Sequence, residues 1–79
     1  MMEDVLQRIT FHKDVLCGKP VIRGLRISVE QILELLANGV SSPEILEEYP
    51  DLESDDVRAA LVYAHHIVAG ETVLDRIAA

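Results

Sequence analysis

A run of helical periodicity, interrupted at two points, constrains this chain more than any other feature. Between Ser28 and Gly70 apolar residues recur with the three- and four-residue spacing of amphipathic helices. Asn38-Gly39 interrupts the pattern with a pair able to take the left-handed conformation that ends helices. Pro50 interrupts it again, because a proline disfavours helical geometry in the residue before it. The sequence therefore predicts three helices joined by two turns.

The first helix is predicted from Val29 to Asn38. Ser28 and Gln31 have the spacing of a capping box, in which the Ser hydroxyl accepts from a backbone N–H and the Gln side chain reaches back. After a turn at Val40-Ser41, the order Ser42-Pro43-Glu44 supplies a cap, a proline that loses no hydrogen bond, and a carboxylate near the positive helix end. A short second helix should follow, to about Tyr49.

The third helix is predicted to start at Glu53-Ser54-Asp55-Asp56, with acids in its first turn, and to end at Gly70. Beyond it, Thr72 to Ile77 either restarts as a short fourth helix or forms a tail that orders only against a partner. The expected buried stripe of the third helix is Val57, Ala60, Leu61, Ala64 and Val68.

Two short strands are predicted ahead of the helices, after a short helical lead-in. Arg8 to His12 alternates polar and apolar residues, which places Ile9 and Phe11 on one face. Pro20 to Gly24 is the second strand, confined to an edge because Pro20 cannot donate to a ladder. A small hairpin or two-stranded edge is the expected result.

We therefore predict a mainly α fold of three to four helices with a short N-terminal β-hairpin or edge strands. Three helices with a Gly-containing turn between the first two are the layout of a helix-turn-helix domain, but a plain three-helix bundle has the same periodicity. The 79 residues support one small domain. Within it we place the short strands and a basic loop at 8–27, a tri-helical core at 28–69, and a C-terminal helix or tail at 70–79.

Composition and the single cysteine indicate a cytoplasmic protein. Cys17 cannot form an internal disulfide, and the chain opens without a cationic flank and apolar run, so we expect no secretion signal. No apolar run approaches the roughly 20 residues that cross a bilayer. Hydrophobic residues make up 49% of this small chain, so some apolar area should stay exposed in a monomer. We expect a homodimer.

Charge is divided unevenly along the chain. Residues 1–28 hold five basic and three acidic groups (+2), residues 29–79 hold two and eleven (−9), and the sum is the net charge of −7. The first part suits an anionic partner and the second a cationic surface.

The basic residues of the N-terminal part are the candidate phosphate-binding residues. In an extended segment Lys19 and Arg23 point to the same side, near Arg8 and Lys13, so the group could grip DNA phosphates. The alternative is that these side chains are solubilising charges or pair internally with the surplus carboxylates. The predicted phosphate-binding set is Arg8, Lys13, Lys19, Arg23 and Arg26.

The helices themselves are poor DNA readers. A base-reading helix should carry Arg, Lys, Asn or Gln toward the major groove, whereas the second helix offers glutamates and the third offers Arg58 alone. We interpret the acidic faces as solvated surface, or alternatively as a mimic of nucleic acid or a dock for a basic toxin. Val73, Leu74 and Ile77 suit an amphipathic segment that binds a partner or packs on its own domain or dimer mate.

We predict no enzyme, no cofactor and no metal site. Gly18 and Gly24 lack the spacing of a nucleotide phosphate loop and suit turns instead. Adjacent helical residues such as His65 and His66 point about 100° apart, which does not suit a shared metal. Cys17 has no nearby base that would make it a nucleophile.

Three segments together resemble a known family. GKPVIRGLRISV, ILELLANGVS and EILEEYPDLESDDVRAAL are similar to the small bacterial proteins grouped as domain of unknown function 433, which carry a GKPVIKGTRI-like segment, a Gly-Val-Ser turn and a Tyr-Pro-x-Leu step. The resemblance extends from about Ile9 to Ala64. Leu25 departs from it, because Thr is usual there, and so does Glu53, where Thr or Ser often caps the helix and Ser54 could replace it.

The resemblance implies a helix-turn-helix, homeodomain-like or winged-helix-like fold. It also implies the antitoxin of a type II toxin–antitoxin pair, encoded beside a nuclease-like toxin of the PIN class. Our first hypothesis is accordingly an antitoxin-like homodimer that binds a PIN-type toxin and in addition its own promoter DNA. The alternative is a protein interaction module without DNA affinity, in which the helix-turn-helix is a scaffold.

Overall fold

Four α-helices and a two-stranded antiparallel sheet make up the part of the chain that the computed structural model describes, residues 2–70. The elements in chain order are α1 (Met2–Leu6), β1 (Ile9–Thr10), the short 3-10 turn η1 (Leu16–Gly18), β2 (Val21–Ile22), α2 (Val29–Ala37), α3 (Ser42–Glu48) and α4 (Ser54–Val68). The mainly α fold with a small N-terminal sheet is thus confirmed. The predicted C-terminal segment lies outside the described residues.

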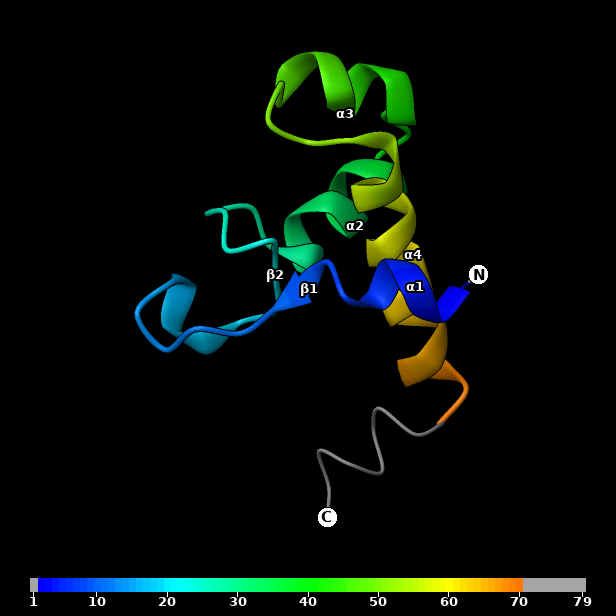
Figure 1. The fold of residues 1–79 in the computed structure, drawn as a ribbon. Helices are drawn as coiled ribbons and strands as arrows, with labels where there is room; N and C mark the ends of the chain where they lie inside the picture. The colour runs from blue at the N-terminus through cyan, green and yellow to red at the C-terminus, as the bar shows by residue number, and fades with distance from the viewer. Residues whose placement is uncertain (1, 71–79) are drawn as a thin grey trace.

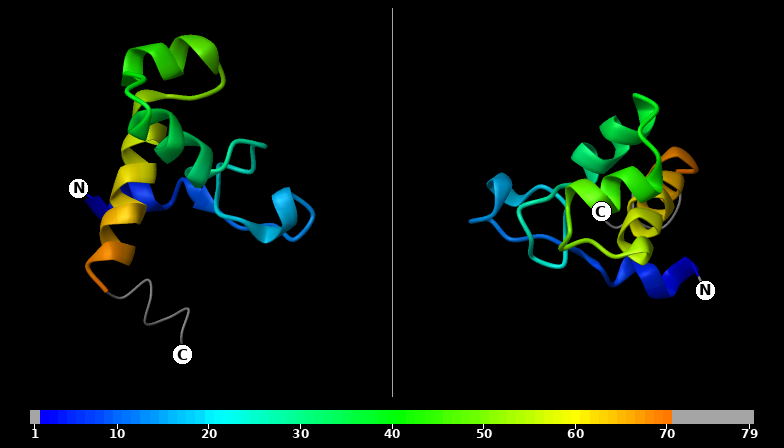
Figure 2. Two further views of the ribbon diagram at one scale, coloured as in Figure 1. Left: turned by 180° about the vertical axis from the view of Figure 1, so that it is seen from behind. Right: turned by 90° about the horizontal axis from the view of Figure 1, so that it is seen from above.

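The long helix α4 is the element against which the others pack. It contacts α1, α2, α3 and β1, and Figures 1 and 2 show α3 at one end of the molecule, with α1 beside the middle of α4. The loop between β1 and β2 extends away from α4 in all three views of Figures 1 and 2. The N-terminal helix and strand therefore pack against the last helix of the described chain.

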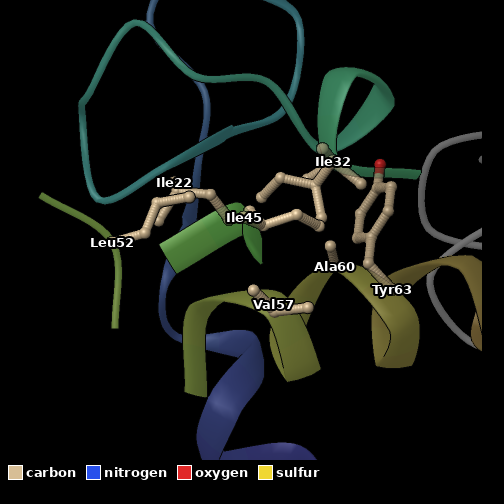
Figure 3. Close-up of a cluster of buried hydrophobic side chains, with 8 residues drawn as sticks. Ile22, Ile32, Ile45, Leu52, Val57, Ala60 and Tyr63 are labelled. Carbon is tan, nitrogen blue, oxygen red and sulfur yellow. The ribbon is translucent and has the colours of Figure 1, made fainter. Parts of the chain in front are cut away.

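The main core lies between α2, α3, α4 and β2. Ile22, Ile32 and Ile45 are completely buried there, and Figure 3 shows their side chains gathered over one face of α4. The other buried members of this cluster are Val29, Leu52, Val57, Ala60 and Tyr63. A second, smaller cluster of Val5, Ala59 and Val62 joins α1 to α4. Because α4 is covered on two sides, its buried face is broad.

The predicted buried stripe of α4 is partly wrong. Leu61 is 49% exposed and Val68 86% exposed, whereas Asp56, Val62 and Tyr63 are buried. The periodicity predicted which residues form the helix but not which of its faces are buried. Ala59 and Val62 are buried on a second side of α4, where they pack with Val5 of α1. Part of the expected stripe is therefore left on the surface.

The helix starts differ from the prediction in their capping contacts. The Ser28 hydroxyl accepts from the Gln31 N–H at 3.0 Å as expected, but the Gln31 amide donates to the Tyr49 hydroxyl at 2.9 Å instead of reaching back. The cap of α3 is Ser41, one residue earlier than predicted. Its hydroxyl accepts from the Glu44 N–H and its own N–H donates to the Glu44 carboxylate at 2.9 Å. Reciprocal capping boxes thus occur at α3 and at α4, where Glu53 is the N-cap, and not at α2.

The strands are shorter than predicted but pair as a small antiparallel sheet. Ile9 lies opposite Ile22 and Thr10 opposite Val21. Phe11 is past the end of β1 and 53% exposed, so the prediction that it shares a strand face with Ile9 is wrong. Its ring instead lies 6.3 Å from the ring of Tyr63, centroid to centroid.

No helix within residues 2–70 is long and apolar enough to cross a membrane.

We expect Ile32→Ala to destabilise the domain by about 2–5 kcal/mol, because it leaves a cavity at a fully buried position. Urea unfolding followed by circular dichroism measures the loss. Glu34→Ala, an exposed substitution in the same helix, should change the free energy of unfolding by no more than about 0.5 kcal/mol. Equal effects of the two substitutions would contradict the described packing of α2.

Candidate functional site

Two of the predicted phosphate-binding arginines converge on one buried carboxylate. Arg8 Nη1 lies 2.9 Å from Asp56 Oδ1, and Arg23 Nη2 lies 2.9 Å from Asp56 Oδ2. Arg23 Nε also donates to Oδ1 at 3.1 Å, so its guanidinium binds the carboxylate through two nitrogens. Asp56 is completely buried, while the side chains of Arg8 and Arg23 are 27% and 36% exposed.

The sheet and the first turn of α4 bring these three residues together. Arg8 precedes β1 and Arg23 follows β2, so antiparallel pairing places them side by side, and the Arg23 N–H donates to the Arg8 carbonyl at 2.7 Å. Asp56 Oδ2 also accepts from the Glu53 N–H at 2.7 Å. Arg8 reaches the Glu53 carboxylate and Arg23 the Asp51 carbonyl, each at 2.7 Å. The cluster joins the N-terminal segment to the start of α4.

The charged state of the cluster is stable at neutral pH. Burial by itself raises the pKa of Asp56, but hydrogen bonds from Arg23, the Glu53 backbone and Arg8 outweigh burial and hold the pKa below its usual value of 3.8. Hydrogen bonds to Asp56 raise the pKa of Arg23, and those to Glu53 and Asp56 raise the pKa of Arg8. Both arginines and the aspartate therefore remain ionised together.

Backbone geometry aims Arg23 at α4. Its φ is +46°, in the left-handed region that a residue with a side chain rarely adopts, and Gly24 follows at +72°. The extended alternation therefore ends at Ile22, and the prediction that Lys19 and Arg23 share one face is wrong. Lys19 instead donates to the Glu30 carboxylate at 3.0 Å, with both side chains well exposed.

The remaining two members of the predicted set are exposed and apart from this cluster. Within residues 2–70 the structure shows no hydrogen bond or ion pair of the Lys13 or Arg26 side chain. The predicted set thus divides into three cations that contact carboxylates and two that are open to solvent. Phosphate binding by any of them stays a prediction.

Sequence reasoning missed Asp56 as the partner of the arginines. We assigned the acids of the first turn to the helix dipole, yet Asp56, Ala60 and Tyr63 are spaced by four and three residues, as one helix face requires. Ala60 and Tyr63 are core residues. The position of an acid on the apolar face was the available signal for a buried charge that needs a partner.

Apolar side chains gather at the C-terminal half of α4. Leu61, Ile67 and Val68 are exposed, and we call them, with the half-buried Ala64, the α4 stripe. It borders a largely apolar groove, which we call the apolar groove, and Glu30 is the one charged residue in its lining. The lining residues are Pro20, Val29, Glu30, Leu33, Tyr63, Ala64, Ile67 and Val68. Of the α4 residues expected to be core, Leu61 and Val68 are therefore exposed and Ala64 is half-buried.

No metal-binding group of three or more His, Cys, Asp or Glu residues occurs in the described part of the chain. The rings of His65 and His66 lie 5.6 Å apart in an edge-on arrangement. Cys17 is exposed in the turn η1.

We expect Asp56→Asn to lower the free energy of unfolding at pH 7 by about 3 kcal/mol, because it leaves two arginines without their buried partner. The native contribution of Asp56 is fully present above its unfolded pKa, near 3.8, and is lost as pH falls through the lower folded value. Urea unfolding at a series of pH values should therefore show a fall in stability below about pH 4 that is smaller in the variant.

The matched control is Asp55→Asn, since Asp55 is half-exposed and lies 3.9 Å from Arg8. It should cost no more than about 1 kcal/mol. If Asp56→Asn lowers the free energy of unfolding no more than Asp55→Asn does, the structural role of the cluster is contradicted.

Comparisons with known proteins place the chain in a family. Residues 9–64 match the family described as Protein of unknown function (DUF433). An uncharacterized protein, y4eO, of Sinorhizobium fredii (strain NBRC 101917 / NGR234) is 38% identical over 56 residues, which are 71% of this chain and 25% of that protein. The chain therefore spans about a quarter of the length of that relative. No solved structure matches. This chain belongs to the DUF433 family.

Proposed function

We propose that this domain is an antitoxin-like protein-binding module that acts as a homodimer and does not read DNA sequence. The observation that carries the proposal is the α4 stripe, an apolar surface on an otherwise acidic molecule. Exposed apolar patches of this kind mark protein interfaces. The resemblance to antitoxins supplies the proposed partner, a PIN-type toxin, and the proposed helix-turn-helix type of the fold, in which α2, the turn at 38–41 and α3 form the motif.

The spacing within the α4 stripe suits pairing with another helix. Leu61, Ala64 and Val68 are separated by three and four residues, the spacing of a coiled-coil seam. Val68 is 86% exposed and is one of the residues that line the apolar groove. Under two-fold symmetry the α4 stripe of each copy packs against the apolar groove of the other copy.

Charge also favours a second copy at this surface. From Val57 to Gly70 the chain has no Asp or Glu, and its only Lys or Arg is Arg58. Two copies with a net charge of −7 each repel one another over most of their surfaces, and least where carboxylates are missing. The C-terminal half of α4 is therefore where self-association costs least.

Contacts of the basic residues count against DNA reading. Arg8 and Arg23 donate to Asp56, and Lys19 donates to Glu30, so phosphate contact would require these pairs to break. Neither α2 nor α3 has a Lys, Arg or His, although both belong to the proposed helix-turn-helix. A duplex with its dense negative charge would be repelled by these helices.

DNA binding is the second candidate, and the observation in its favour is the exposure of Lys13 and Arg26. A dimer would present two copies of each. Such contacts would be to phosphates and would carry no sequence information directly.

We expect Val68→Lys to convert a dimer into a monomer at protein concentrations of about 100 µM, because it buries a charge in an apolar seam. Size-exclusion chromatography with light scattering measures the mass. Ala37→Lys is the matched control: it places the same charge in the last turn of α2 at an exposed position, and it should leave the dimer intact. A monomeric wild type, or a dimeric Val68→Lys variant, would rule out the α4 stripe as the dimer interface.

We expect no preference for the chain's own upstream DNA over a scrambled duplex in fluorescence anisotropy at about 50 and 200 mM salt. The double variant Lys13→Ala, Arg26→Ala should give the same titration as the wild type. Sequence-preferring binding that weakens steeply with salt and disappears in the double variant would replace our proposal with the second candidate.

A further inference from the structure

We propose that a groove between the end of α2 and α3 binds a cationic amphipathic segment of a partner protein. We call it the α3 groove, and its lining residues are Leu35, Val40, Glu44, Ile45, Glu47, Glu48 and Tyr49. This proposal rests on the proposed protein-binding function and adds the chemistry of the partner. The α3 groove is distinct from the α4 stripe, with which it shares no residue.

The α3 groove combines an apolar floor with an acidic rim. Leu35, Val40 and Tyr49 are half-buried, and the Tyr49 hydroxyl is fixed by the hydrogen bond from the Gln31 amide. Glu44, Glu47 and Glu48 are exposed around this floor. Hydrogen bonds from the Ser41 N–H and hydroxyl lower the pKa of Glu44, so its charge persists at mildly acidic pH.

The acids of the rim belong to a larger excess of negative charge. The segment from Ile27 to Val57 contains no Lys, Arg or His, and its acids are Glu30, Glu34, Glu44, Glu47, Glu48, Asp51, Glu53, Asp55 and Asp56. Among these, four lie within 4 Å of a basic side chain: Glu30, Glu53, Asp55 and Asp56. For the side chains of the others the structure shows no ion pair within residues 2–70: Glu34, Glu44, Glu47, Glu48 and Asp51. The unbalanced charge is therefore concentrated at and near the α3 groove.

This combination specifies the chemistry of the occupant. A negative field attracts cations and repels nucleic acid and acidic peptides. The apolar floor favours aliphatic side chains, and the long stems of Lys and Arg can lie on it while their charged ends meet the rim. A helix or extended segment with alternating apolar and basic positions satisfies both requirements. In Figures 1 and 2, α3 stands at one end of the molecule, where such a segment has access.

The probe is a synthetic, fluorescein-labelled peptide of about twelve residues with Leu and Arg at helical spacing, titrated into the full chain and followed by anisotropy and by amide chemical shifts. We expect saturable binding that shifts the amides of Leu35, Val40 and Ile45. Replacement of Arg by Glu, or of Leu by Ser, in the peptide should abolish it. The double variant Glu47→Gln, Glu48→Gln should weaken binding by about three- to tenfold, because two exposed ion pairs are lost.

The control variant Asp4→Asn, Asp14→Asn changes the net charge equally at exposed positions outside the groove and outside the acidic segment, and it should bind as tightly as the wild type. Absence of binding at about 1 mM peptide, equal binding of the Leu-to-Ser peptide, or equal weakening by the two double variants would overturn the α3 groove as a site. None of these results bears on the α4 stripe, because the mass of the Val68→Lys variant tests that surface separately.

Discussion

The buried carboxylate of Asp56 is the interaction on which the arrangement of this domain depends. Without it, the like charges of the two arginines that the sheet places side by side would repel one another, and a sheet of two residues per strand is marginal by itself. Asp56 also accepts from the backbone at the start of α4. One side chain thus fixes the N-terminal segment, the turn before α4 and the helix start relative to one another. Ile22 directly precedes Arg23 in the sequence, and its side chain is part of the main core.

This structural use of arginine divides the charge of the molecule into separate regions. Arg8, Lys19 and Arg23 neutralise the acids that lie nearest the sheet and the start of α4, and the sequence from Ile27 to Val57 has no basic residue close to the acids of α3. The excess of acidic over basic groups is therefore not spread evenly. It accumulates at the end of the molecule formed by α3, while the C-terminal half of α4 has no carboxylate. A single salt-bridge cluster consequently shapes surfaces far from itself.

Local signals in the sequence predicted the helices, and non-local contacts explain what they left out. Asn38-Gly39, Pro50 and Gly70 mark helix ends that depend on local backbone preferences, so α2, α3 and α4 end close to where we expected. The left-handed φ of Arg23 and the burial of Asp56 depend on each other across 33 residues, which no local pattern encodes. The orientation of α4 depends likewise on α1, and for that reason the stripe containing Leu61 and Val68 was mistaken for core. The sequence leaves internal pairing open for every candidate phosphate-binding residue, and only the fold determines that Arg8, Lys19 and Arg23 pair with carboxylates.

Binding at the two proposed surfaces depends on different forces, so each surface can act independently of the other. The α4 stripe is apolar and uncharged, so its association is driven by burial and changes little with salt. The α3 groove depends on unpaired carboxylates, whose attraction for a basic segment is screened over about 10 Å at 0.1 M salt. They lie toward opposite ends of α4, since α3 is beside the helix start and Val68 ends it (Figure 1). A homodimer formed through α4 would therefore leave both α3 grooves open, and it would bring two negative surfaces to one basic partner. Such paired attachment raises the effective affinity of each weak site without any new contact.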